Sequence, residues 1–192
     1  MWRSCKLKNS LLGVWLTCVA LWTLASPANQ VIEINGARFP TLQATESGLL
    51  KLQGAGLLKW GIWFEVYAAA YYVDETNPLT RRLVIEYFVP IEAEQIKSAA
   101  ERHLMKQQDA DLVAAMKPAL DRLHAALRDV DKGDRYALTL DADRTLILER
   151  NGNQVLRLHE PALGEAYLNL WLGENPIDVN LRLSLLGVEG RY

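Results

Sequence analysis

The sequence has few of the residues that build metal centres or reactive thiols. Its 192 residues include three histidines and two cysteines, and no HExxH or similar close pair of ligands occurs. The G-x-S-x-G elbow of serine hydrolases is missing as well. Gly54-Ala55-Gly56 lacks the third glycine and the lysine of a phosphate loop, so we interpret it as a strand bulge or a close backbone approach. We therefore expect no metal and no cofactor.

Long apolar runs are also scarce, and the longest lies at the N-terminus. Arg3, Lys6 and Lys8 precede the apolar stretch Leu11–Leu24, which ends in Ala25-Ser26-Pro27-Ala28. The run is short for a membrane span, which needs about 20 apolar residues. The pattern predicts that residues 1–28 are a secretory signal peptide, cleaved after Ala25 or Ala28. An uncleaved anchor is the alternative. We expect an exported protein, periplasmic in a bacterium, with no stable membrane span after cleavage.

Basic charge is scarce in the part that would remain. Cleavage removes three of the 21 basic residues and none of the 23 acidic ones, which leaves a net charge of −5. No basic stripe survives, so nucleic acid is not expected as a partner. Both cysteines, Cys5 and Cys18, are lost with the leader. Residues 29–192 are therefore expected to fold as one domain without a disulfide.

The stretch from Lys51 to Asp74 predicts a central pair of strands. One alternating set in its second half is apolar apart from one phenol: Ile62, Phe64, Val66, Ala68, Ala70 and Tyr72. The other set carries a carboxylate and two phenols: Trp63, Glu65, Tyr67, Ala69, Tyr71 and Val73. We expect helices to cover the first set and a cavity to lie against the second.

The rest of the chain predicts further strands and four helices. Asn35-Gly36 and Asn151-Gly152 are typical of tight hairpins. Helical spacing follows Glu92 and Asp109, where Pro118 should kink or divide the helix. Further strands are expected at Arg81–Val89, Tyr136–Leu140, Thr145–Arg150 and Gln154–Leu158, and further helices at Pro161–Leu172, ended by a left-handed Gly173, and at Val179–Leu186. The result is an α+β fold with a mostly antiparallel sheet.

Two tyrosines are the best candidates for a site. Tyr67 and Tyr71 are four apart on one strand face, and a phenol can donate to a carboxylate, a carbonyl or an enolate. The alternative is that both rings lie at the edge of the core with their hydroxyls in water. We expect His103 to serve packing, and Asp141 and Asp143 to be turn residues.

The ordered motifs resemble the chalcone isomerase-like family. Gly54-Ala55-Gly56 followed by Phe64–Val73 resembles its signature strand. The later motifs follow in the order and at the spacing of the exported bacterial members: Lys132-Gly133-Asp134, Asn151-Gly152, the segment 171–176 and Leu185-Leu186-Gly187. The resemblance implies a curved antiparallel sheet with helices packed on one face, an open-faced sandwich.

The resemblance also implies three possible activities. Plant enzymes of the family close a chalcone to a flavanone with an arginine soon after the glycine motif and hydroxyl groups on the next strand. Relatives in plastids bind fatty acids in the same cleft, where an arginine and a tyrosine hold the carboxylate. Other members are non-catalytic helpers.

Leu58 occupies the position where the resemblance implies the arginine. Lys59 is adjacent but should point to the opposite face, because strand side chains alternate. Loss of the cation removes the charge-assisted contact to an enolate or carboxylate. We therefore predict a non-catalytic protein that binds a small apolar ligand such as a fatty acid. The candidate ligand-binding residues are Lys59, Tyr67, Tyr71 and Arg102, with Arg81 as a further candidate cation.

Two alternatives stay open. The first is an isomerase or lyase that acts on a chalcone-like unsaturated ketone through Tyr67. The second is a scaffold of the cell envelope that binds a protein partner, whose identity the sequence leaves open.

Overall fold

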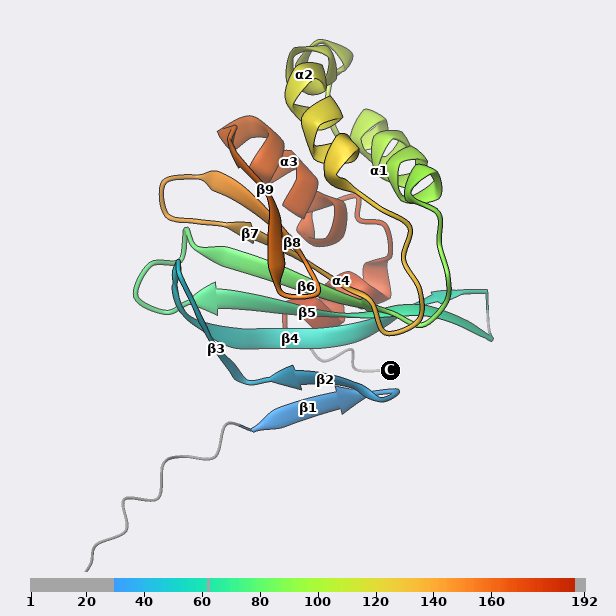
Figure 1. Cartoon of the computed structure of the whole chain (residues 1–192), viewed down its shortest axis with the longest axis vertical. Helices are drawn as coiled ribbons and strands as arrows, with labels where there is room; N and C mark the ends of the chain where they lie inside the picture. The colour runs from blue at the N-terminus through green and yellow to red at the C-terminus, as the bar shows by residue number, and fades with distance from the viewer. Residues whose placement is uncertain (1–29, 62, 189–192) are drawn as a thin grey trace, which may run out of the picture.

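A seven-stranded antiparallel sheet forms the centre of the computed structural model, which describes residues 30–61 and 63–188 (Figure 1). The spatial order β3-β4-β5-β6-β7-β8-β9 follows the chain, so each strand pairs with the next. The strands are β3 (Leu42–Thr45), β4 (Gly48–Trp60), β5 (Phe64–Asp74), β6 (Arg81–Tyr87), β7 (Arg135–Leu140), β8 (Thr145–Arg150) and β9 (Asn153–His159). The sheet curls into a half-barrel, which confirms the predicted α+β class.

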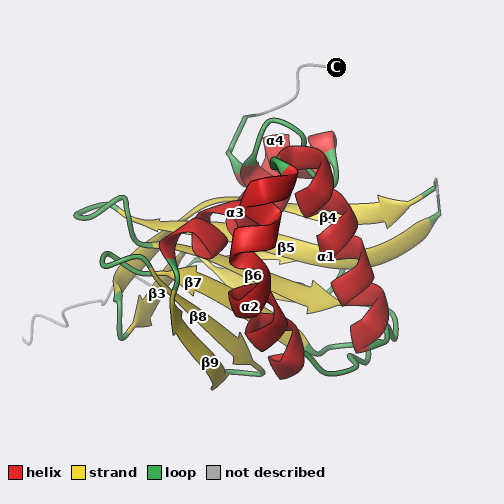
Figure 2. Ribbon diagram, turned by 90° about the horizontal axis from the view of Figure 1, so that it is seen from above, coloured by secondary structure: helices red, strands yellow, loops and turns green. Residues whose placement is uncertain are grey.

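Four helices lie on one side of this sheet (Figure 2). They are α1 (Ala93–Gln107), α2 (Ala110–Ala126), α3 (Pro161–Leu172) and α4 (Val179–Leu185). The first two connect β6 to β7, and the last two follow β9. The hairpin of β1 (Val31–Ile34) and β2 (Ala37–Pro40) lies on the other side (Figure 1). The open-faced arrangement is therefore closed in part by this hairpin.

The two predicted Asn-Gly hairpins are confirmed. All four residues have positive φ, between 50° and 88°, as the mirror-image turn requires. Pro118 was predicted to kink or divide its helix, and helix α2 continues through Pro118 without dividing. The predicted left-handed cap at Gly173 is wrong, because its φ is −71°. Gly173 is needed for space, because an added Cβ would lie 2.7 Å from the carbonyl oxygen of Asn169.

The glycine pair of β4 allows α4 to pack onto the sheet. A Cβ on Gly54 would lie 2.0 Å from the Ser184 carbonyl oxygen, and one on Gly56 would lie 2.6 Å from the Ser184 Cβ. The ladder between β4 and β5 also shifts register between Leu52 and Gly54. The close-approach interpretation of these glycines is thus confirmed.

The predicted assignment of the two faces of β5 is wrong. Tyr67, Ala69 and Tyr71 belong to the core that packs under the helices. Ala68, Ala70 and Tyr72 pack instead against Ala37 and Phe39 of the β1–β2 hairpin and against neighbouring strands. The helices therefore cover the face that carries two phenols, and the more apolar face meets the hairpin.

The predicted signal peptide, with both cysteines, lies outside the described residues. Within residues 30–61 and 63–188, no helix is long and apolar enough to cross a membrane. The same residues contain no cluster of three or more potential metal ligands from histidine, cysteine, aspartate and glutamate.

Candidate functional site

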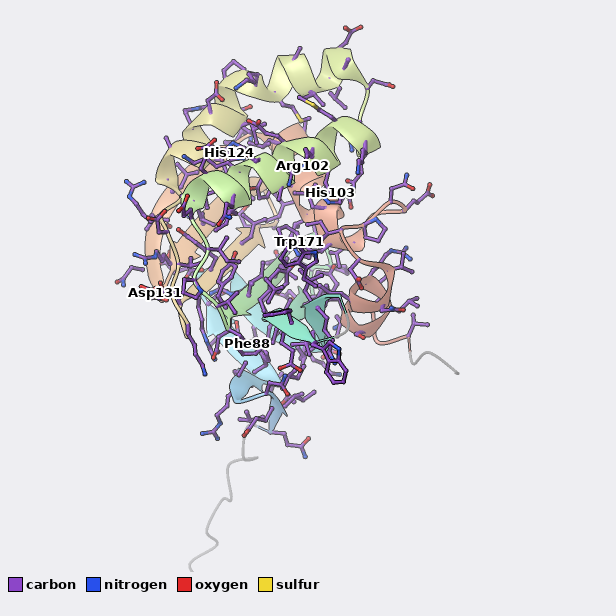
Figure 3. All side chains as sticks on the ribbon, turned by 90° about the vertical axis from the view of Figure 1, so that its right-hand side faces the viewer. Phe88, Arg102, His103, His124, Asp131 and Trp171 are labelled. Atoms are coloured by element: carbon purple, nitrogen blue, oxygen red, sulfur yellow. The ribbon has the colours of Figure 1, made fainter. Side chains whose placement is uncertain are left out.

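A hydrogen bond between Tyr67 and Trp171 joins the sheet to the helix layer. The indole N–H of Trp171, on α3, donates to the Tyr67 hydroxyl over 2.8 Å, and Figure 3 places Trp171 between helices and sheet. Tyr67 is 6% exposed, and its ring meets the edge of Tyr87 at a centroid distance of 5.7 Å. Burial raises the pKa of Tyr67 well above its usual value, against the opposing effect of the Trp171 hydrogen bond. The phenol therefore keeps its proton and can act as a donor.

An apolar space lies beside this pair, under the helices. Its volume is about 50 Å³, enough for about one water molecule. Aliphatic and aromatic side chains line it: Leu83, Ile85, Tyr87, Ile96, Leu127, Tyr136, Leu138, Leu148, Tyr167 and Trp171. The protein's own side chains thus fill most of the cleft.

Leu58 lies next to the Tyr67 phenol. The two residues are direct partners across β4 and β5, and Leu58 packs against the core on the helix side. Among the described residues, no lysine or arginine forms a hydrogen bond or ion pair with Tyr67. An apolar side chain thus lies beside Tyr67 at the position where the resemblance implies an arginine.

The structure does not bring Lys59 or Arg102 to Tyr67. Lys59 is half-exposed and pairs with Glu65 over 3.9 Å. Arg102 is exposed on α1 (Figure 3). Their roles in ligand binding stay predictions.

The cation that reaches the tyrosine face is Arg81, beside Tyr71. Tyr71 is 7% exposed. Burial raises its pKa, and the positive charge of Arg81 opposes this shift. Arg81 is itself paired with Glu165 over 2.6 Å, and Arg144 reaches the same carboxylate over 2.8 Å. This end of the face therefore holds a cation that already has an anionic partner.

The remaining polar candidates have structural roles. Both Asp141 and Asp143 accept a hydrogen bond from the backbone N–H of Thr145, over 2.8 and 2.9 Å, which confirms the predicted turn. His103 is half-buried on α1, and burial lowers its pKa. Within residues 30–61 and 63–188, none of these three side chains forms a hydrogen bond with Tyr67.

A larger groove lies on the opposite face of the sheet, where the sequence predicted the helices. Its volume is about 870 Å³, and it runs between β3 and the strands β7 to β9. Ion pairs join Arg82 to Glu149 and Arg135 to Glu86 along it. Fully buried Tyr72 lies on this face, and burial raises its pKa to about 12. The sequence pattern missed this groove because alternation identifies two faces without showing which one the helices cover.

Sequence reasoning also missed Trp171 as a partner of Tyr67. Two sequence features do point to Trp171. It belongs to one of the motifs that carry the family resemblance, and it lies on the apolar side of the predicted helix. Because 104 residues separate Trp171 from Tyr67 in the chain, no sequence pattern indicates that the two side chains meet.

The sequence pattern of the chalcone isomerase-like family matches residues 31–187. The chain belongs to this family. Among solved structures, an Arabidopsis thaliana fatty-acid binding protein aligns with a TM-score of 0.66 and 18% identity, over 82% of this chain and 96% of that one. At this identity the likeness shows the fold, and it confirms the curved sheet with its helix layer. No curated protein sequence matches the chain.

Proposed function

We propose that this chalcone isomerase-like protein binds a small, mostly apolar molecule such as a fatty acid and does not convert it. The observation that carries the proposal is the Tyr67–Trp171 pair, in which the indole N–H holds the Tyr67 hydroxyl and leaves its O–H as a donor beside an apolar lining. Few polar groups in an apolar surrounding are typical of small-molecule sites. The shared fold of the Arabidopsis fatty-acid binding protein supports this ligand class.

The polar end of the site favours an uncharged head group. Tyr67 keeps its proton and can donate it to a carbonyl or to a protonated carboxyl group. A bare carboxylate beside Leu58 would be buried without a cation, which costs several kcal/mol. The affinity for a fatty acid should therefore fall as the pH rises above the pKa of its carboxyl group.

Binding requires the helix layer to move. The space of about 50 Å³ is far below the roughly 300–1,000 Å³ of typical ligand sites. Helices α1 and α2 leave the sheet after β6 and return at β7, while β6 and β7 pair directly with each other. The two helices can therefore shift outward without breaking a strand pair.

The filled interior also supports a second candidate, a scaffold that binds a protein partner and holds no internal ligand.

The catalytic alternative has less support. Leu58 stands where the implied cation would be, and the raised pKa of Tyr67 keeps the phenol protonated, so it offers no phenolate base near neutral pH. Turnover of a chalcone by the wild-type protein, abolished in Tyr67→Phe, would favour the catalytic alternative.

Native mass spectrometry with lipid extraction tests the proposed function. Wild-type protein should carry or take up members of a fatty-acid panel. Ile85→Phe fills the space under the helices and should abolish uptake. Val84→Phe is the matched control, because the neighbouring side chain packs on the other face, and it should keep uptake. A protein that is empty and binds no member of the panel would favour the scaffold.

We also propose that the protein acts after export. The basic residues before Leu11–Leu24 and the small residues after it support this. Intact mass of the periplasmic fraction of a bacterial host should give an N-terminus at Ser26 or Asn29. Full-length protein confined to the cytosolic fraction would refute export.

A further inference from the structure

Three large aromatic side chains are exposed together where β4 turns into β5. Trp60, Trp63 and Phe64 are 79%, 85% and 68% exposed. All other phenylalanine, tyrosine and tryptophan side chains in residues 30–61 and 63–188 are buried or half-buried. We call Trp60, Trp63 and Phe64 the aromatic tip. Such a concentration of exposed apolar surface marks a site of interaction.

The geometry of the hairpin presents the aromatic tip away from the body. Trp60 and Phe64 are direct partners across the two strands, and Trp63 lies in the turn between them. Gly61 turns the chain with a φ of +65°. Figures 1 and 2 both show this end of the hairpin extending beyond the helix layer. A flat surface can therefore reach the aromatic tip before it meets the rest of the protein.

We propose that the aromatic tip inserts into the interface of a lipid bilayer and holds the protein on the membrane surface. Tryptophan is enriched at membrane interfaces, because its ring is apolar and its N–H is polar. The pair of Lys59 and Glu65 follows directly behind the tip, half-exposed, where the head groups would lie. This inference goes beyond ligand binding and does not depend on it.

The exposed area of the aromatic tip fits a bilayer better than a protein partner. Three rings bury about 150–250 Å² each, so their exposed parts offer roughly 350–600 Å². A stable protein interface needs about 800 Å² on each side. A bilayer has no such minimum, because it surrounds an inserted tip on all sides. The net charge of −5 over residues 29–192 indicates that apolar insertion, rather than attraction to anionic lipids, carries the binding.

Partitioning onto vesicles tests the proposal. Protein expressed from the complete sequence is purified as the host processes it, and its N-terminus is read by intact mass. It should cosediment with phosphatidylcholine vesicles, equally well in 0.1 and 0.5 M NaCl, because apolar insertion is not screened by salt. The triple variant Trp60→Ser, Trp63→Ser, Phe64→Ser, in the same processed form, should partition at least tenfold more weakly.

A matched control separates the aromatic tip from general surface apolarity. Leu49→Ser, Leu79→Ser and Val155→Ser change three exposed side chains elsewhere and should leave partitioning unchanged. Circular dichroism should show that both triple variants are folded, since all the replaced side chains are exposed. Wild-type protein that ignores vesicles, or a tip variant that binds as well as wild type, would overturn the proposal. Loss of a copurifying protein from the tip variant, without vesicle binding by wild type, would overturn it in favour of a protein partner.

Discussion

Adding one methyl group to Gly54 of β4 should push α4 away from its packed position on the sheet. A Cβ on Gly54 would lie 2.0 Å from the Ser184 carbonyl oxygen, whereas ordinary contact begins at 3.4 Å, so the helix must move by about 1.4 Å. The atom in the way is backbone, which no side-chain rotation can relieve. Helix α4 buries Leu181 and Leu185 against the core, and the movement loosens both.

The expected cost of Gly54→Ala follows from these contacts. Overpacking typically costs about 1–3 kcal/mol, and full truncation of a buried leucine costs about 2–5 kcal/mol. Partial loosening of two leucines places the loss of unfolding free energy at about 3 kcal/mol. For a chain of this length that corresponds to a fall in Tm of roughly 6–12 °C. Urea unfolding followed by circular dichroism measures it, and an unchanged m-value keeps the comparison valid.

Gly56 provides the internal comparison. Its added Cβ would meet side-chain atoms, the Ser184 Cβ at 2.6 Å and the Leu181 Cδ1 at 3.0 Å. Gly56→Ala should therefore cost about 2 kcal/mol, and Ser184→Gly should restore at least half of that loss. The same second change should not restore Gly54→Ala. Gly152→Ala is the control for backbone strain alone, since its φ is +80° with open space around it, and it should cost about 1 kcal/mol.

Two results would refute this reasoning. The first is a Gly54→Ala variant within about 0.5 kcal/mol of wild type. The second is equal rescue of both glycine variants by Ser184→Gly. Either result would mean that α4 does not pack onto β4 through these two positions.

Three further predictions concern the phenols. In a double-mutant cycle of Tyr67→Phe and Trp171→Phe, the coupling in unfolding free energy should be about 1 kcal/mol, and a coupling of zero would contradict the hydrogen bond. Leu58→Arg should place a cation beside Tyr67 and raise the affinity for a fatty acid at pH 8 by about 10–100-fold, as measured by titration. Weaker binding by this variant would contradict the proposal that the missing cation makes the site prefer an uncharged head group. Burial raises the pKa of Tyr72 to about 12, so the folded state keeps the phenol protonated to a higher pH than the unfolded chain does. The contribution of this phenol to the free energy of unfolding should therefore be full below about pH 10 and decline as the pH rises towards 12. Chemical unfolding between pH 8 and 12 measures the decline, which should be smaller in Tyr72→Phe.

Local patterns encode only part of the strand pairing. Asn-Gly turns and two-residue alternation identify the hairpins β1–β2 and β8–β9, whose strands are neighbours in the chain. The pairing of β6 with β7 is long-range, because α1 and α2 lie between these strands, and no local pattern names it. The glycine pair was also interpreted correctly, as a close approach. The packing partner of those glycines, α4, lies about 130 residues later, and no local pattern names it.

The site was harder to predict because polarity alone misassigned the faces of β5. Two phenols on one face suggested a cavity, yet Tyr67 is satisfied by a buried indole N–H from α3. A buried hydroxyl with a partner is compatible with a core, and the partner becomes visible only when distant segments meet. Of the three candidate cations, Arg81 is the one that approaches a tyrosine of this face, Tyr71, from the paired strand.

The α1–α2 segment has a consequence for how the molecule opens. It departs from the sheet after β6 and rejoins it at β7, and two backbone hydrogen bonds of 2.9 Å between Ile91 and Val130 close its base. The segment contributes no strand to the ladder from β3 to β9, and side chains such as Leu104, Leu120 and Leu123 join it to the core. We therefore expect it to open as one unit while the strand pairs stay formed. In native-state hydrogen exchange its amides should open together, at a lower free energy than those of β5 and β6. Insertions between α1 and α2, at the exposed Asp109, should therefore disturb neither the strand ladder nor the buried leucines of the two helices.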